Sequence, residues 1–447
     1  MSEMAKAIRS LETARNARKM LPSFYDRGLG KRKNIAWCMH GVPTELLMAF
    51  DIEAEWPENF GAFCASQLVA QKFIAMAEQE GYTGDLCAYL TNTMGYCKRS
   101  KDVGGVAPES PYPGGMGEPV VLLGSGYLCD PRYKWFQAIA TRYINVPIFN
   151  SDPMSPPYDI DIKDKRIKEH YLEQLRQDIW GQIVFLEEKL GKKFDVTRFR
   201  RIMEISQESL YYWCKSLELR KAKPCPMGAA DYFTCIIPQL FMLGKEEGLE
   251  FYKALYAEMK ERVANGQGVV KNEKYRMYFA GIPPYFNLGM FNYLEKLGAV
   301  SVFESVYYPG PFVDVDLKDP VEGLVQRIWE RASWYHECRT EAMPEICNPG
   351  IMLGVGSKFL LELVDEYEID GAVMHRTHSC RAISWGQVHY KNLLEKADVP
   401  ALVFESDMAD PRKWSDARFK AQIEPFIEMM EYRKYKKVQK KSNSQEI

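Results

Sequence analysis

Short apolar segments that alternate with helical segments constrain the fold of this chain most. The segments with the composition of buried strands are residues 33–38, 118–123, 145–148, 275–281, 299–304, 371–375 and 400–404. Helices are expected between and after them, at 44–50, 60–80, 283–297, 319–337, 355–367, 382–396 and 413–436. Strands that alternate with helices form parallel sheets covered by helices. The sequence therefore predicts an α/β fold with two sheet-forming regions.

The middle of the chain has a different pattern. Apolar residues recur there at helical spacing over 162–190, 195–220 and 244–264, with charged residues between them. A helical region thus separates the two α/β regions. The predicted organisation is an N-terminal helical arm (1–30), an α/β domain (31–155), a helical domain (156–265), a second α/β domain (266–437) and a frayed tail (438–447).

Length and charge narrow the class of protein. The chain has 447 residues, which is too long for one ordinary core, and a formal net charge of −2, which does not favour a nucleic-acid partner. No apolar run approaches the roughly 20 residues that a membrane span needs. The N-terminus lacks the apolar segment of a signal peptide. We expect a cytoplasmic protein that binds neither membranes nor nucleic acids.

The cysteines point to chemistry. There are 11 of them, an odd number that does not suit a disulfide framework, and no two are spaced Cys-x-x-Cys as in zinc ribbons or thioredoxin-type motifs. Cys129 and Cys380 each follow an apolar strand, where ligands bind in α/β sheets, and Cys87 lies in a short apolar segment. Three thiols so far apart in sequence can meet only if the two α/β regions face each other. Such a meeting would suit an iron–sulfur cluster with one iron left open.

Four sequence motifs carry a resemblance to a known family. They are Cys87-Ala-Tyr-Leu with Gly95 after it, the strand that ends at Cys129-Asp, Ser379-Cys-Arg-Ala-Ile-Ser-Trp-Gly-Gln, and Glu405-Ser-Asp-Met-Ala-Asp-Pro-Arg. Together they resemble the 2-hydroxyacyl-CoA dehydratase and benzoyl-CoA reductase family (D-component), over about residues 33–430. The resemblance implies two flavodoxin-like domains and a helical one. It also implies a 4Fe-4S cluster between the domains, held by Cys87, Cys129 and Cys380.

The resemblance also implies partners. In that family the catalytic component pairs two related subunits, so we expect a smaller homologous subunit, an ATP-hydrolysing activator that donates electrons, and an acyl-CoA thioester substrate. No Walker sequence is present, so the chain itself is not expected to hydrolyse ATP. With three thiolates on a cluster, the fourth iron can accept a substrate oxygen and polarise a thioester carbonyl. Electron transfer to that carbonyl would then give a ketyl radical.

Two further residues are candidates for catalysis. The segment Cys38-Met-His-Gly-Val-Pro-Thr-Glu45 resembles the family's first strand–turn–helix. Glu45 is predicted to relay a proton or to accept a hydrogen bond near the cluster, unless it is a helix-start carboxylate favoured by the macrodipole. His40 is a candidate proton donor. Cys38 is expected near the cluster without binding it. If one of the three assigned ligands is wrong, a reserve ligand would take its place, and these reserve ligands are Cys97, Cys225, Cys338 and Cys347.

Three functions remain open from the sequence. The first is a subunit of an ATP-dependent reductase that converts benzoyl-CoA-type thioesters to cyclic dienes, favoured by the chain length and the 404–431 segment. The second is a subunit of a 2-hydroxyacyl-CoA dehydratase, which eliminates water. The third is an electron-relay subunit that does not touch substrate. A scaffold without a cluster would leave the three cysteines unexplained.

Overall fold

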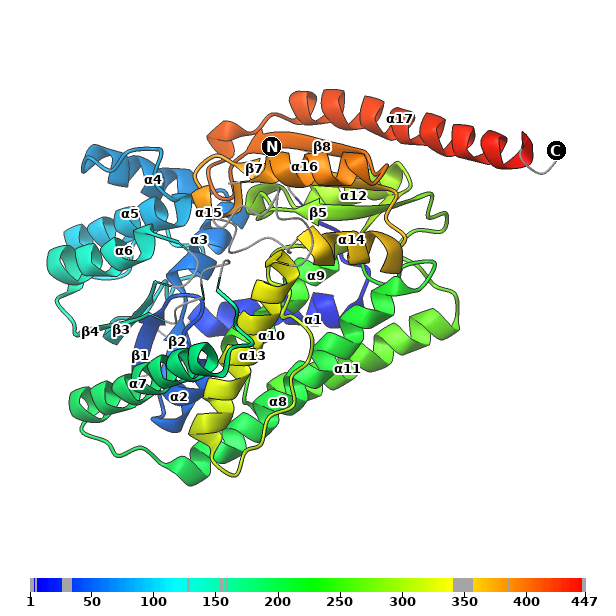
Figure 1. Cartoon of the computed structure of the whole chain (residues 1–447). Coiled ribbons are helices and arrows are strands. Elements are labelled where there is room, and N and C mark those ends of the chain that lie inside the picture. The colour runs from blue at the N-terminus through cyan, green and yellow to red at the C-terminus, as the bar shows by residue number, and fades with distance from the viewer. Residues whose placement is uncertain are drawn as a thin grey trace.

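The computed structural model places two parallel sheets on opposite sides of the molecule (Figure 1). It describes residues 4, 6–25, 34–126, 129–152, 156, 160–340, 357–384 and 386–443. The first sheet has the order β2-β1-β3-β4 and the second β6-β5-β7-β8. All neighbouring strands are parallel. The predicted α/β class with two parallel-sheet regions is confirmed.

The first sheet and its helices occupy the first part of the chain. The strands are β1 (Ile35–Cys38), β2 (Glu53–Glu55), β3 (Pro119–Ser125) and β4 (Ile148–Ser151). The helices are α2 (Thr44–Ala49), α3 (Pro57–Ser66), α4 (Ala70–Gln79), α5 (Ala88–Val103) and α6 (Pro131–Ile139), followed by a π-helical turn (Ala140–Ile144). The helix expected over 60–80 is two helices, because Leu68 between them has a left-handed φ of 60°.

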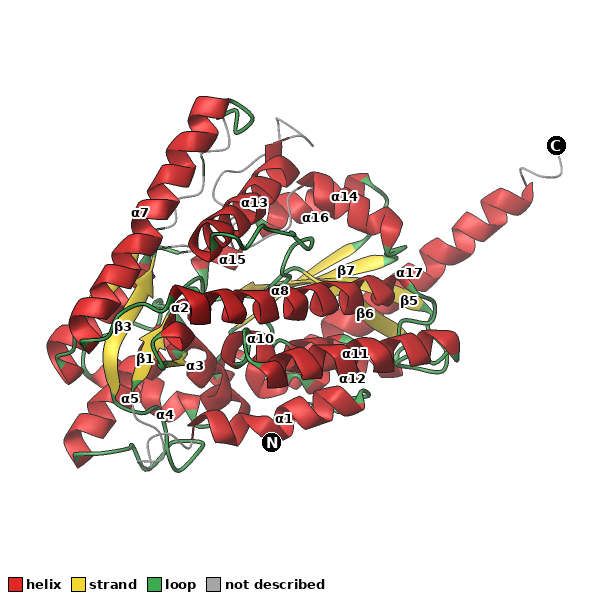
Figure 2. Cartoon of the chain, turned by 90° about the horizontal axis from the view of Figure 1, so that it is seen from below, coloured by secondary structure: helices red, strands yellow, loops and turns green. Residues whose placement is uncertain are grey.

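The helical region consists of α7 (Lys165–Leu190), α8 (Val196–Glu218), α9 (Ala229–Cys235), α10 (Ile237–Phe241) and α11 (Glu246–Ala264). Asp164 and Asp195 start the two long helices, because their carboxylates accept hydrogen bonds from first-turn amides. In Figure 2, α8 runs from the side of the first sheet toward the side of the second. The helix α1 (Glu12–Tyr25), in the expected N-terminal arm, packs against α9. One side of α1 is therefore buried, with Ala14, Ala17, Leu21, Phe24 and Tyr25 in the interior.

The second sheet follows. Its strands are β5 (Tyr275–Ala280), β6 (Ala299–Glu304), β7 (Gly371–Thr377) and β8 (Ala401–Ser406). Its helices are α12 (Gly289–Lys296), α13 (Pro320–Thr340), α14 (Ser357–Glu366), α15 (Arg381–Ser384), α16 (Gln387–Lys396) and α17 (Asp416–Asn443). Short 3-10 turns cover Leu219–Lys221, Tyr285–Asn287 and Pro411–Lys413. The end of α17 extends away from the body (Figure 1) and continues past the expected end of that helix.

Both sheets have the strand order of flavodoxin-like folds, in which the first strand is flanked by the second and the third. Ligands in such sheets bind beyond the carboxyl ends of the two central strands. Here those strands are β1 and β3 in one sheet and β5 and β7 in the other. The loops that follow these four strands therefore position the site. In the described part of the chain no single helix is long and apolar enough to cross a bilayer, and α3 and α4 pass such a test only as a pair bent by 118°.

Candidate functional site

The structure brings together the three cysteines that the sequence singled out. Cys87, Cys129 and Cys380 line one cavity of about 120 Å³ between the two halves of the chain. Cys129 follows β3, Cys380 follows β7, and Cys87 immediately precedes α5. All three are free thiols and half-buried. The loops after two parallel sheets thus converge on one point from opposite sides.

Backbone amides surround the thiols. The backbone N–H groups of Tyr89 and Leu90, in the first turn of α5, act to lower the pKa of Cys87. The amide of Arg132 acts in the same direction on the pKa of Cys129, and the amide of Ile383 on that of Cys380. At least one backbone N–H group therefore acts on each sulfur, and such contacts stabilise negative charge on sulfur.

Burial and mutual proximity dominate the acidity of these thiols. Burial raises the pKa of Cys87, and the negative charges of Cys380 and Cys129 raise it further. Burial raises the pKa of Cys380 to about 12, against the opposing effect of its amide contact. The pKa of Cys129 is also raised by burial, while Arg132 opposes the shift. The three thiols line one cavity, so negative charge on Cys129 or Cys380 disfavours ionisation of Cys87.

The donor set fits a cluster better than a single ion. A single zinc ion needs its ligands about 2.3 Å away. Among the residues that the structure describes, no three His, Cys, Asp or Glu side chains are close enough to share one ion. A cubane binds each thiolate at a different iron atom, so its ligands stand farther apart while still sharing one cavity. The three thiols share one cavity, as the ligands of such a cluster would.

One hydrogen bond joins the two halves directly at the thiols. The hydroxyl of Ser379, next to Cys380, accepts a hydrogen bond from the amide of Ala88, next to Cys87, at 3.1 Å. Ser379 is itself fixed because its amide donates to Asp407 at 3.0 Å. The positions of Cys87 and Cys380 are thus coupled through their neighbours in the sequence.

His40 lies in the same cavity, as a candidate proton donor should. Its backbone amide donates to Glu58 at 2.8 Å, and its carbonyl accepts from Arg132 at 2.6 Å. Burial lowers the pKa of His40 to about 4, although Glu58 opposes the shift. The imidazole is therefore neutral near pH 7, where it can accept a proton and can donate a hydrogen bond from its remaining N–H group. Its role as a proton donor stays a prediction.

Glu45 does not line the thiol cavity. It faces an adjoining cavity of about 200 Å³, and the two cavities share the side chains of His40, Trp56, Leu240 and Arg331. Glu45 is buried, forms an ion pair with Arg327, and accepts a hydrogen bond from Ser206 at 2.7 Å. Burial acts to raise its pKa, but Arg327 and Ser206 more than offset this and hold the pKa below its ordinary value. Its role in proton relay stays a prediction.

The remaining cysteines lie elsewhere. Cys38 is buried at the end of β1 and does not line the thiol cavity, and neither do the reserve ligands Cys97 and Cys225. Cys347 and the side chain of Cys338 lie outside the part of the chain that the structure describes. Among the described cysteines, the set Cys87, Cys129 and Cys380 is therefore the one that converges.

Two charged residues of the site were not singled out from the sequence. Arg132 is buried and pairs with Glu58 at 2.5 Å, and both line the thiol cavity. Burial acts to raise the pKa of Glu58, while Arg132 and His40 lower it more strongly. Their positions in the sequence could have identified them. Glu58 follows Pro57 at a helix start, and Arg132 lies three residues after Cys129.

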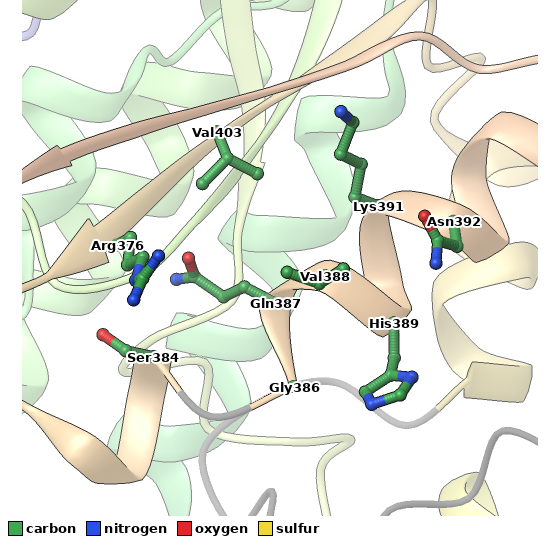
Figure 3. A pocket seen from close by; sticks show the side chains of 9 residues that line it. All are labelled: Arg376, Ser384, Gly386, Gln387, Val388, His389, Lys391, Asn392 and Val403. Carbon is green, nitrogen blue, oxygen red and sulfur yellow. The ribbon is translucent and has the colours of Figure 1, made fainter.

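A wider cavity lies beside α16, away from the thiols. It measures about 540 Å³ and is lined by Arg376, Ser384, Gly386, Gln387, Val388, His389, Lys391, Asn392 and Val403. Figure 3 shows Gln387 extending toward Arg376, whereas Lys391 and His389 point in opposite directions. None of the described cysteines lines it, and its polar groups do not converge. The thiol cavity is the better candidate for chemistry.

Comparison with known proteins gives matches along nearly the whole chain. Residues 39–430 match the family model described as 2-hydroxyglutaryl-CoA dehydratase, D-component. The alpha subunit of (R)-2-hydroxyisocaproyl-CoA dehydratase from Clostridioides difficile is 28% identical, over 90% of this chain and 91% of that protein. The alpha subunit of (R)-phenyllactyl-CoA dehydratase from Clostridium sporogenes is 26% identical, over 89% and 90%. One of the subunits of benzoyl-CoA reductase from Thauera aromatica is 27% identical, over 93% and 94%.

Proposed function

Because the chain belongs to the 2-hydroxyglutaryl-CoA dehydratase D-component family, we propose that it is the iron–sulfur subunit of an enzyme that acts on an acyl-CoA thioester. The observation that carries the proposal is the convergence of Cys87, Cys129 and Cys380 in one cavity. These thiols would hold a 4Fe-4S cluster. When bound, the cluster would supply an electron and an open iron site for a substrate oxygen.

The residues of the chain have separate tasks in this proposal. The first-turn amides around the thiols spread the negative charge of the sulfurs and tune the reduction potential. The apolar and aromatic lining of the cavity excludes water, which would quench a reduced intermediate. His40, neutral near pH 7, is the candidate for moving a proton at the substrate. Glu58 and Arg132 hold its backbone in place.

Dehydration of a 2-hydroxyacyl-CoA is the first candidate reaction. Dehydratase subunits are the more numerous of the curated relatives, and they match about nine-tenths of this chain. Reduction of an aromatic ring, which the sequence alone favoured, becomes the second candidate. It is supported by the match to a benzoyl-CoA reductase subunit, which covers 93% of this chain. Either reaction implies a second, related subunit and an ATP-dependent activator as partners.

Substrate contact in this chain is part of the proposal. The thiol cavity adjoins a second cavity of about 200 Å³, with which it shares four lining residues. A subunit that only relays electrons has no need of such space. A substrate analogue bound at the iron of this chain, or a substrate whose isotope-labelled oxygen binds that iron, would exclude the relay function.

The first test measures the cluster. Protein purified without oxygen is expected to contain about four irons per chain and to be brown. Cys380→Ala, Cys87→Ala and Cys129→Ala should each lose most of that iron. Cys97→Ala, on the helix that follows Cys87 but outside the cavity, should keep it. Native protein without iron, or equal iron in all four variants, would contradict the proposal.

The second test separates the two reactions. The chain, produced with its related subunit, is supplied with activator, ATP and reductant, and then with either a 2-hydroxyacyl-CoA or benzoyl-CoA. Formation of an enoyl-CoA supports the dehydratase, and formation of a cyclic diene thioester supports the reductase. Mass spectrometry of the thioesters distinguishes the products, because the first loses water and the second gains two hydrogens.

A further inference from the structure

Tyr307 has a strained backbone at the edge of the thiol cavity. Its φ is 63°, in the left-handed region that residues other than glycine rarely adopt. The surrounding structure holds it there. The hydroxyl of Tyr232 donates to the carbonyl of Val306 at 2.8 Å, and the amide of Ser305 donates to Phe279 at 3.0 Å. Strain of this kind persists where neighbouring contacts enforce it, and it is concentrated at functional sites.

The strained backbone directs the ring of Tyr307 into the cavity. The ring meets His40 edge to face, with centroids 6.0 Å apart and an interplanar angle of 87°. On another side it meets Phe233 at 6.4 Å. His40 comes from the loop after β1 and Tyr307 from the loop after β6, so this contact closes the cavity between the two sheets.

Other rings continue the same surface. Trp56 lies 6.4 Å from His40, and Tyr308 and Tyr335 complete a set that we call the aromatic wall: His40, Trp56, Tyr307, Tyr308 and Tyr335. The guanidinium of Arg331 lies over the ring of Tyr335, 5.8 Å from its centroid, and donates to the carbonyl of Tyr308 at 3.3 Å. The wall lies at the border with the adjoining cavity, because His40, Trp56 and Arg331 line both.

This surface distinguishes a flat ring from a branched alkyl group. Both bury apolar area, but a ring also gains from offset or edge-to-face contacts at centroid distances of about 4.5–7 Å and from a nearby guanidinium. The aromatic wall presents rings at inclined angles and a cation in reach. We propose that the site takes a thioester whose acyl group carries an aromatic ring, and that Tyr307 is the residue that selects it. This inference rests on the proposed function, since it concerns the acyl group of the same thioester.

The experiment compares two thioesters that differ at one group. Phenyllactyl-CoA carries a phenyl ring where 2-hydroxyisocaproyl-CoA carries an isopropyl group. Calorimetric titration of the anaerobic enzyme without ATP or reductant measures binding while no turnover occurs. The aromatic thioester is expected to bind about tenfold more tightly. In Tyr307→Asn, which removes the ring but tolerates the left-handed φ, the preference should fall to about twofold. Tyr307→Phe should keep it.

A control and a second variant make the result decisive. Tyr432→Asn, at a tyrosine of α17 that is 58% exposed, should leave both affinities unchanged. If Tyr307→Asn does not fold, Tyr335→Leu tests the same wall and should lower the preference in the same direction. Equal binding of the two thioesters, or a preference that survives loss of the Tyr307 ring, overturns this inference alone. Failure to bind these two thioesters and benzoyl-CoA alike overturns the proposed function with it.

Discussion

Glu45 and Arg327 form a buried ion pair beside the thiol cavity, and the two residues come from different halves of the chain. Ser206, on α8, hydrogen-bonds to both side chains. The carboxylate was expected from the sequence to relay protons, yet its partners hold it ionised. At the residue scale, its measurable contribution is therefore to stability. A proton relay would require this pair to separate during the reaction.

Replacing Arg327 tests that contribution. Arg327→Met leaves the Glu45 carboxylate buried without its cation, which is expected to lower the free energy of unfolding by about 3–5 kcal/mol at pH 7. Because the pKa of Glu45 lies below 4.5 in the folded protein, the pair stabilises the fold above that pH and its contribution is lost as pH falls. The difference in unfolding free energy between Arg327→Met and the unchanged protein should therefore become smaller at acidic pH. Urea unfolding at pH 7 and at low pH measures both effects.

The control is an exposed ion pair. Arg201 and Glu246 lie 2.7 Å apart with side chains 63% and 58% exposed. Arg201→Met should change stability by less than about 0.5 kcal/mol. If Arg327→Met behaves like Arg201→Met, Glu45 does not depend on its partner, and the proton-relay role regains its place as the main expectation.

At the element scale, the crossing of α4 and α5 positions the first thiol. Gly95 lies where these helices touch: a Cβ atom there would meet the carbonyl oxygen of Phe73 at 1.8 Å. A side chain could rotate away from the added atom, but the backbone of α4 cannot. Because Cys87 immediately precedes α5, the placement of the thiol depends on how closely α5 packs against α4.

Gly95→Ala is expected to lower the free energy of unfolding by about 3 kcal/mol or more, since the added methyl forces the helices apart. It should also reduce iron binding, because the N-terminus of α5 moves with the helix. Gly105→Ala is the matched control, at a glycine just after α5 with no atom within 4 Å of the added Cβ. Thermal unfolding and iron content of the two variants give the comparison, and a stable, iron-replete Gly95→Ala would refute the close crossing.

Most strands and long helices could be predicted from the sequence, because their apolar residues follow a clear period. The helix α5 was missed for a physical reason. Its residues from Ala88 to Cys97 are all buried, including the polar Thr91, Asn92 and Thr93. A helix buried on every side has no amphipathic period to detect. For the same reason the sequence did not show that Cys87 starts a helix.

The residues of the candidate site likewise fall into those that the sequence could place and those that it could not. Cys129 and Cys380 could be placed at strand ends because the strands themselves are recognisable. The aromatic wall could not be foreseen, since Trp56, Tyr307 and Tyr335 come from distant segments with no shared local pattern. Convergence of this kind depends on how the two sheets face each other. The family resemblance identified the three thiols, whereas the other residues of the site are brought together by the packing of the two halves.

At the scale of the whole molecule, contacts across the site join the two halves. Arg412 pairs with Glu78 at 2.7 Å, and Arg381 pairs with Asp130. These pairs are partly exposed and contribute little individually. A cluster held by thiols from both halves would be a much stronger connection, and its binding would add to the stability of the closed arrangement.

Removal of the cluster is therefore expected to loosen the molecule between its halves. Chelation of iron from the anaerobic protein should lower the unfolding midpoint by about 5 °C or more. Hydrogen exchange should speed up in the first turn of α5 and in residues 377–384, while the strands β1 and β5 stay protected. An iron-free protein with unchanged exchange at these thiol loops would contradict the view that the cluster joins the halves.

The division of the three thiols between the halves also determines when maturation can finish. Cys87 and Cys129 belong to the part of the chain that is synthesised first, whereas Cys380 is added only after most of the second sheet. A group held by all three cannot be completed on a nascent chain that still lacks the second sheet. Insertion of the proposed cluster would therefore have to follow synthesis of the second sheet, and the machinery that delivers iron and sulfide would act on a chain whose two halves have already been made.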